Sequence, residues 1–177
     1  FFDYLYQYIQ VLTARGRMRT AEAYKEAFNC YMRYRKGEDI LLQEIDSNEI
    51  EGFEASLKER GLALNTISFY MRILRATYNR ATEEFTIPYQ SNPFRNVYTG
   101  RERTVKRAVN IRVIRALKKL DLSDQPKLEV ARDMFLLSFY LRGMSFIDMA
   151  YLRRRNLKND TLIYRRRKTG QQLVICW

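Results

Sequence analysis

Apolar residues recur every three or four positions through the first half of the chain, which is the spacing of amphipathic helices. Gly16, Gly37 and Gly61 punctuate this pattern. We expect four helices, beginning near Phe2, Thr20, Ser47 and Asn65 and ending near Ala14, Lys36, Arg60 and Glu84. Thr20, Asn65, and either Asp46 or Ser47 are the expected N-caps of the last three. Four helices with short connections predict a small all-helical domain.

The helical periodicity of apolar residues resumes in the second half of the chain, in shorter segments. Three helices are expected there: one capped by Asn110, a buried helix over 127–141, and one from the cap Ser145 to Leu152. The runs 162–164 and 173–175 are strand-like and flank a Lys-Thr-Gly turn, which predicts a β-hairpin. The predicted fold class is therefore mainly α with a small hairpin.

Prolines and polar residues interrupt the periodicity between the two halves. Residues 89–108 are polar and basic, and we interpret them as an interdomain linker. The prediction is a helical domain over residues 1–88 and a second domain over residues 109–177.

Charge narrows the class of partner. The chain has 177 residues, with 32 Lys and Arg against 20 acidic residues and a net charge of +12. Such a field favours a polyanion, and duplex DNA is the first candidate. Charge alone does not exclude two other possibilities: a basic surface that is merely solvated, or an RNA-binding protein of the ribosomal type.

Absent and rare residue types exclude several chemistries. The chain has no histidine, which excludes histidine metal sites and Ser-His-Asp or Cys-His hydrolysis within it. Cys30 and Cys176 are too few for a disulfide framework and favour a reduced cytoplasmic compartment. No apolar run is long enough to span a membrane. We expect no metal ion, no cofactor and no membrane contact.

Basic and polar side chains form a stripe on the fourth predicted helix, gather near the start of the second, and recur along the linker. Such a stripe is either a solvated face or a row of phosphate and base contacts. The candidate DNA contacts on the helices are Arg17, Arg19, Thr20, Lys25, Asn65, Thr66, Ser68, Arg72 and Arg75. Those of the linker are Arg101, Arg103, Lys106 and Arg107.

Several segments together resemble the tyrosine recombinase (phage integrase) family. They are Thr20 and Tyr24, the run Asn65-Thr66-Ile67, the run Asn92-Pro93-Phe94, the stretch from Arg142 to Asp148, and the turn Lys168-Thr169-Gly170. The resemblance is closest to integrases of bacterial conjugative transposons. It implies a four-helix SAM-like core-binding domain followed by the first half of an α+β catalytic domain. It also implies an enzyme of a mobile element that cuts and rejoins DNA through a 3′-phosphotyrosine intermediate.

The resemblance implies roles for residues of the second half. Lys168 matches the family's hairpin lysine, a general acid. Ser145 occupies the position of the first catalytic arginine, and we expect Arg142, three residues upstream, to replace that arginine. Asp148 matches the acidic residue that orients it. Physically, cations hold the charge that develops on the phosphate oxygens, and a donor protonates the leaving 5′ oxygen.

Plainer roles for the same four residues stay open. They are a helix cap for Ser145, a charge that complements a helix dipole for Arg142, a local salt bridge for Asp148, and a plain phosphate contact or a solvated turn for Lys168.

The sequence also departs from the family pattern. It has no His-x-x-Arg segment, and none of its thirteen tyrosines stands where the family nucleophile belongs. We therefore expect a fragment that binds double-stranded DNA in the bacterial cytoplasm without completing cleavage, as a monomer in solution and a multimer on DNA. The alternative is a non-enzymatic transcriptional regulator with a helix-turn-helix near residues 139–152. An RNA binder ranks last because no recognition-module signature is present.

Overall fold

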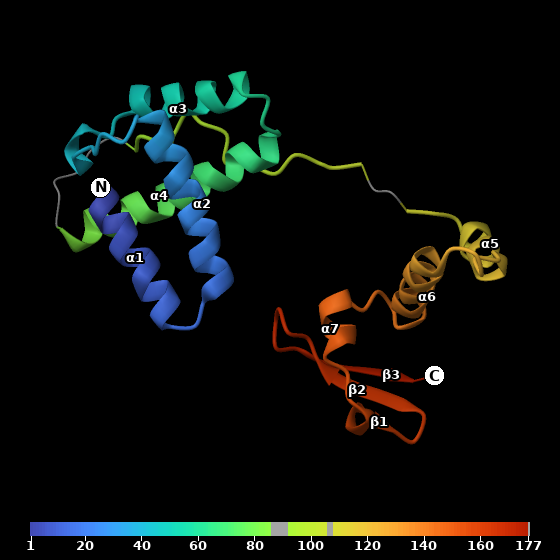
Figure 1. The fold of residues 1–177 in the computed structure, drawn as a ribbon. Helices are drawn as coiled ribbons and strands as arrows, with labels where there is room; N and C mark the ends of the chain where they lie inside the picture. The colour runs from blue at the N-terminus through green and yellow to red at the C-terminus, as the bar shows by residue number, and fades with distance from the viewer. Residues whose placement is uncertain (86–91, 106–107, 177) are drawn as a thin grey trace. The chain divides into compact units, whose positions relative to one another are not determined.

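The computed structural model describes residues 1–85, 92–105 and 108–176. Within these residues the protein is mainly helical with one three-stranded antiparallel sheet, which confirms the predicted fold class. The chain divides into two compact units, Phe1–Thr104 and Val105–Trp177 (Figure 1).

The first unit is a bundle of four α-helices. They are α1 (Phe2–Ala14), α2 (Met18–Tyr34), α3 (Ser47–Glu59) and α4 (Leu64–Glu84), with a 3-10 turn η1 (Leu42–Glu44) before α3. Aromatic rings fill the centre of the bundle, where the ring of Tyr31 meets that of Phe53 edge-on at 5.0 Å between centroids. Both side chains are fully buried. The core therefore forms from the apolar helix faces that the periodicity predicts.

Helix starts match the prediction where a side chain caps the helix. The Asp46 side chain accepts a hydrogen bond of 2.8 Å from the backbone nitrogen of Glu49, and α3 begins at the next residue after this cap. By contrast, α2 and α4 have no side-chain cap and begin before the expected residues. Thr20 and Asn65 therefore lie in the first turns of their helices and are not N-caps.

The segment that follows α4 corrects the predicted linker. Phe94 and Val97 are buried in the core of the first unit, and the backbone nitrogen of Tyr98 donates to Glu54 Oε1 at 2.7 Å. Burial of apolar side chains outweighs the polar composition of this segment. The described residues 92–104 thus belong to the first unit, so that the unit extends past residue 88 and the predicted linker 89–108 is too long.

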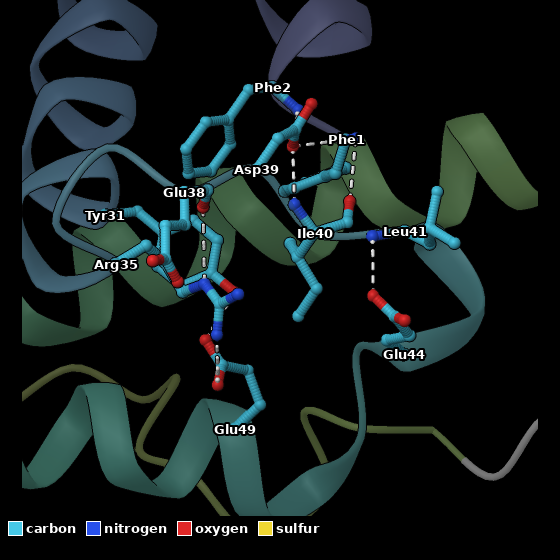
Figure 2. A network of polar contacts seen from close by, with 10 residues as sticks. All are labelled: Phe1, Phe2, Tyr31, Arg35, Glu38, Asp39, Ile40, Leu41, Glu44 and Glu49. Atoms are coloured by element: carbon cyan, nitrogen blue, oxygen red, sulfur yellow. Dashed lines mark hydrogen bonds and ion pairs between the residues drawn. The ribbon is translucent and has the colours of Figure 1, made fainter.

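Two carboxylates tie the loop after α2 and the helices together at one end of the bundle (Figure 2). Asp39 in that loop accepts a hydrogen bond of 2.8 Å from the backbone nitrogen of Phe2 at the start of α1. Glu49 of α3 accepts from the Tyr31 hydroxyl at 2.9 Å and from Arg35 Nη1 at 3.3 Å. These contacts link α1 to the loop and α2 to α3.

The second unit combines three helices with a small sheet. Its elements are α5 (Ile111–Lys119), α6 (Pro126–Tyr140), α7 (Phe146–Ala150), the 3-10 turn η2 (Arg154–Asn156), β1 (Leu157–Lys158), β2 (Thr161–Arg165) and β3 (Gln172–Cys176). The strands are antiparallel in the order β1-β2-β3, and Leu162 pairs with Ile175. Asn110 and Ser145 cap α5 and α7 with their side chains, as predicted.

Helix α6 is not the buried helix that its apolar run predicts. Leu136 is buried, whereas Phe135, Leu137 and Phe139 are 39–42% exposed. Apolar residues occur on all sides of α6, and within the described part of the unit the helix packs against α5 and α7. An apolar run alone cannot distinguish a fully buried helix from a partly covered one.

Candidate functional site

The polar stripe of α4 is partly covered by the segment that follows the helix. The Asn65 amide pairs with the backbone of Glu102: its nitrogen donates to the carbonyl oxygen at 3.1 Å, and its oxygen accepts from the backbone nitrogen at 2.9 Å. The Ser68 hydroxyl donates to the carbonyl oxygen of Gly100 at 2.6 Å, and this side chain is fully buried. Ser68 is therefore corrected from a candidate DNA contact to an internal one.

Three of the candidate DNA contacts come together at a shallow hollow of about 350 Å³ between α2 and α4. Asn65, Thr66 and Arg72 line this hollow together with Glu26 and Tyr70. The Tyr70 hydroxyl donates to Glu26 Oε1 at 3.0 Å. This bond holds the carboxylate of Glu26, so that the hollow presents both donors and acceptors.

The other candidates are dispersed. Arg17, Arg19, Thr20 and Lys25 are exposed on α2 and the turn before it, and none of them lines the hollow between α2 and α4. Arg75 is partly buried, and its Nη1 donates to Thr99 Oγ1 at 3.3 Å. Arg101 and Arg103 are exposed, whereas Lys106 and Arg107 lie outside the described residues.

Arg142 has an unusual backbone conformation for its residue type. Its φ is 56°, in the left-handed region that favours glycine. It follows the last residues of α6, where its nitrogen bonds to the carbonyl of Phe139 and that of Gly143 bonds to the carbonyl of Ser138. This is the Schellman pattern, in which glycine usually stands at the position of Arg142. The guanidinium is exposed and bonds to no group within the described residues.

Ser145 and Asp148 form a compact pair at the start of α7. The Ser145 hydroxyl donates to Asp148 Oδ2 at 2.7 Å and accepts from the Asp148 backbone nitrogen at 3.3 Å. The other carboxylate oxygen, Oδ1, accepts from the backbone nitrogen of Arg167 at 2.9 Å. The bond from Arg167 and that from Ser145 hold the pKa of Asp148 below its usual range. Asp148 is therefore a carboxylate that joins two turns.

Lys168 stands one residue past this contact, in the turn between β2 and β3. Its side chain is exposed. Backbone bonds close the turn: Arg166 N donates to Gln171 O at 2.8 Å, and Gly170 N donates to Arg166 O at 2.8 Å. Ser145, Asp148 and the turn that carries Lys168 thus lie together, although they are far apart in the sequence.

The sequence alone does not reveal the partners that fix these residues. Glu102 and Arg167 act through their backbone groups, so their side-chain types carry no signal. The one available hint is that Asn and Asp side chains readily bond to backbone groups, as Asn65 and Asp148 do here.

In residues 1–85, 92–105 and 108–176, no three His, Cys, Asp or Glu side chains gather in a way that would hold a metal ion. Over the same part of the chain, no helix has the length and apolar character needed to cross a membrane.

The sequence matches a known domain family, and the fold matches solved structures. Residues 1–98 match the Phage integrase SAM-like domain family, and the chain belongs to this family, as its sequence predicts. The fold is also similar to that of the Tn1549 transposon integrase in complex with a circular intermediate DNA, at 16% identity and a TM-score of 0.66, over 97% of this chain and 57% of that one. The same integrase in complex with transposon right end DNA gives 15% identity and a TM-score of 0.62, over 97% and 56%.

At these sequence identities, the structural similarity establishes a shared fold. The chain spans little more than half the length of those integrases. No curated protein matches the sequence.

Proposed function

We propose that this chain is the DNA-binding and phosphate-positioning part of a tyrosine recombinase that integrates a mobile element of the conjugative-transposon type. The first unit binds duplex DNA, and the second presents Arg142 and Lys168 to the scissile phosphate. The observation that carries the proposal is the carboxylate of Asp148, which joins the start of α7 to the turn of Lys168. Family membership and the shared fold of the integrase–DNA complexes support it.

Each residue has a distinct part in the proposed chemistry. The Arg142 guanidinium, always charged, donates two parallel hydrogen bonds to the non-bridging phosphate oxygens. The Lys168 ammonium gives a proton to the leaving 5′ oxygen. Asp148 and Ser145 are positioning residues, because their bonds fix the two turns and leave no free carboxylate oxygen beside the phosphate.

Cleavage needs a nucleophile that these 177 residues do not supply at the family's position. We expect the polypeptide to bind DNA without forming a covalent adduct. It is a monomer in solution and assembles on DNA, which sedimentation with and without duplex measures. A complex with DNA that survives SDS would contradict the assignment of this polypeptide as catalytically incomplete.

A non-enzymatic transcriptional regulator receives less support. In that alternative, α7 would be the helix that reads the major groove. It has five residues, little more than one turn; the Asp148 side chain is bonded to the cap Ser145 and to the hairpin. A recognition helix needs several side chains free to reach base edges.

The test is the salt dependence of duplex binding. Fluorescence anisotropy with a labelled duplex should give a log Kd that rises linearly with log salt concentration. Arg101→Gln with Arg103→Gln should lower the slope by up to about 2 and weaken binding to all sequences alike. Lys36→Gln with Lys119→Gln is the charge-matched control, because both lysines are exposed and neither is a candidate contact.

Two results would overturn the proposal. One is a preference for structured RNA over duplex DNA. The other is duplex binding that the control pair weakens as much as the Arg101 and Arg103 pair, because binding would then follow net charge alone.

A further inference from the structure

The second unit contains a hollow of about 220 Å³ beside the hairpin. Its wall comes from the end of α7, the turn η2 and the strand β2. It shares Asp148 with the proposed active site, but not Arg142 or Lys168. Four arginines line it, with Tyr151 and Asn156 between them: Arg153, Arg155, Arg165 and Arg167.

The arginines around this hollow are only partly balanced by an acidic side chain of the protein. None of the four forms an ion pair with another of the described residues. Asp148 is in the wall and its charge attracts that of Arg167, but one carboxylate cannot balance four guanidinium groups. Like charges around one small space repel one another, and a bound anion would relieve that repulsion.

The hollow is also held in shape. Asn156 Oδ1 accepts from the backbone nitrogen of Arg153 at 2.8 Å, and its Nδ2 donates to the carbonyl oxygen of Ile163 at 3.0 Å. These bonds fasten η2 to β2. The guanidinium carbon of Arg167 lies 3.8 Å from the centroid of the Tyr151 ring, a cation–π contact that directs the side chain. A donor that is already held in place, as the Arg167 guanidinium is, binds an anion at a lower entropic cost than a mobile one.

We propose that this hollow binds a phosphate group of the DNA backbone, in addition to the scissile phosphate assigned to Arg142 and Lys168. The inference rests on the proposed function and extends it. The planar guanidinium matches two phosphate oxygens at once, which favours phosphate over a smaller anion. A backbone contact contributes affinity for every sequence alike and sets the position of the second unit on the duplex.

The first arm of the test uses DNA. Arg153→Gln with Arg155→Gln should lower the slope of log Kd against log salt by about 1, which is one phosphate contact. The control pair is Arg112→Gln with Arg115→Gln on α5, two exposed arginines outside the lining of the hollow. It should leave the slope almost unchanged. The amide NMR signal of Arg167, bonded to Asp148, reports whether each variant keeps its fold.

The second arm uses inorganic phosphate and no DNA. The Arg167 guanidinium lies over the Tyr151 ring, and the signal of its Nε–Hε group should shift and saturate as phosphate is added. The shift should be lost in the Arg153 and Arg155 pair and kept in the α5 control pair.

The outcomes separate this inference from the proposed function. If the wild type binds duplex DNA but the two variant pairs have the same slope, the subsite is wrong and the proposed function stands. If the wild type does not bind duplex DNA, both fail, and a saturating phosphate shift would then assign the hollow to a free anion. A lower slope together with the Arg167 shift supports the subsite.

Discussion

Asp148 Oδ1 accepts a hydrogen bond of 2.9 Å from the backbone nitrogen of Arg167, 19 positions later in the chain. The bond fixes one side of the turn that presents Lys168. Because the same carboxylate also accepts from Ser145, its position depends on the cap of α7. The start of α7 and the hairpin turn therefore move together.

Replacing Asp148 by Asn should loosen the hairpin turn and change its pH dependence. The folded-state pKa of Asp148 lies below its ordinary value, so the stabilisation is present above the unfolded-state pKa and is lost as pH falls through the folded-state value. The wild type should therefore exceed D148N in unfolding free energy at neutral pH, and the gap should close in acid. Urea unfolding at several pH values measures this.

Asp124→Asn is the control for that prediction, because Asp124 is exposed in the same unit and has no bonded partner among the described residues. A gap between wild type and D148N that stays constant down to strongly acidic pH would show that the charge of Asp148 does not stabilise the turn.

Arg142→Gly should stabilise the second unit relative to Arg142→Ala. A side chain in the left-handed region costs about 1 kcal/mol that glycine avoids, so the two variants should differ by about that amount in urea unfolding. Both lose the guanidinium and should weaken DNA binding equally. Lys36, with φ 55° in the same position after α2, provides the comparison. Lys36→Gly should be more stable than Lys36→Ala by a similar free energy, and neither variant should change DNA binding.

Asn65→Ala should release the segment around Glu102. Two hydrogen bonds are lost, about 1–2 kcal/mol together, which raises the open population roughly 5–30-fold. Trypsin cleavage after Arg101 and Arg103 should accelerate by that factor, because proteolysis follows the open population. Thr66→Ala, the next residue on the helix, should leave the rate unchanged. Equal rates in the two variants would show that Asn65 does not hold the segment.

Alkaline pH should weaken the first unit through its buried tyrosines. Burial and the bond to Glu26 raise the pKa of Tyr70 to about 12. The neutral phenol therefore contributes full stability below the unfolded-state pKa, near 10, and loses it as pH rises towards 12. Tyr70→Phe should make the urea midpoint, followed by circular dichroism, fall less steeply over this range. Tyr6 is exposed, so the urea midpoint of Tyr6→Phe should fall as steeply as that of the wild type.

The sequence predicts the helices well because their signal is local. Ile50, Phe53 and Leu57 recur on one face of α3, and all three are fully buried. Asp46 caps the same helix within three residues of its partner. Contacts between residues that are close in the sequence produce a pattern that predicts the helix without knowledge of the fold.

Other features depend on residues distant in the sequence, and the sequence does not show them. Asn65 has the chemistry of a cap, but its amide bonds to Glu102, 37 positions away. The basic composition after α4 predicts a linker, whereas the side chains of Phe94 and Val97 are buried and anchor the segment in the first unit. Ser145 as a cap was predictable, but the bond from Arg167 to Asp148 requires the register of the hairpin.

The pairing of Asn65 with Glu102 anchors the first unit close to its end at Thr104. Seven residues, 103–109, separate the anchored backbone of Glu102 from Asn110, the cap of α5. In the proposed function, a connection this short gives the second unit a high effective concentration at the duplex once the first unit has bound. The Asn65 amide then contributes to avidity for DNA as well as to the packing of its own unit.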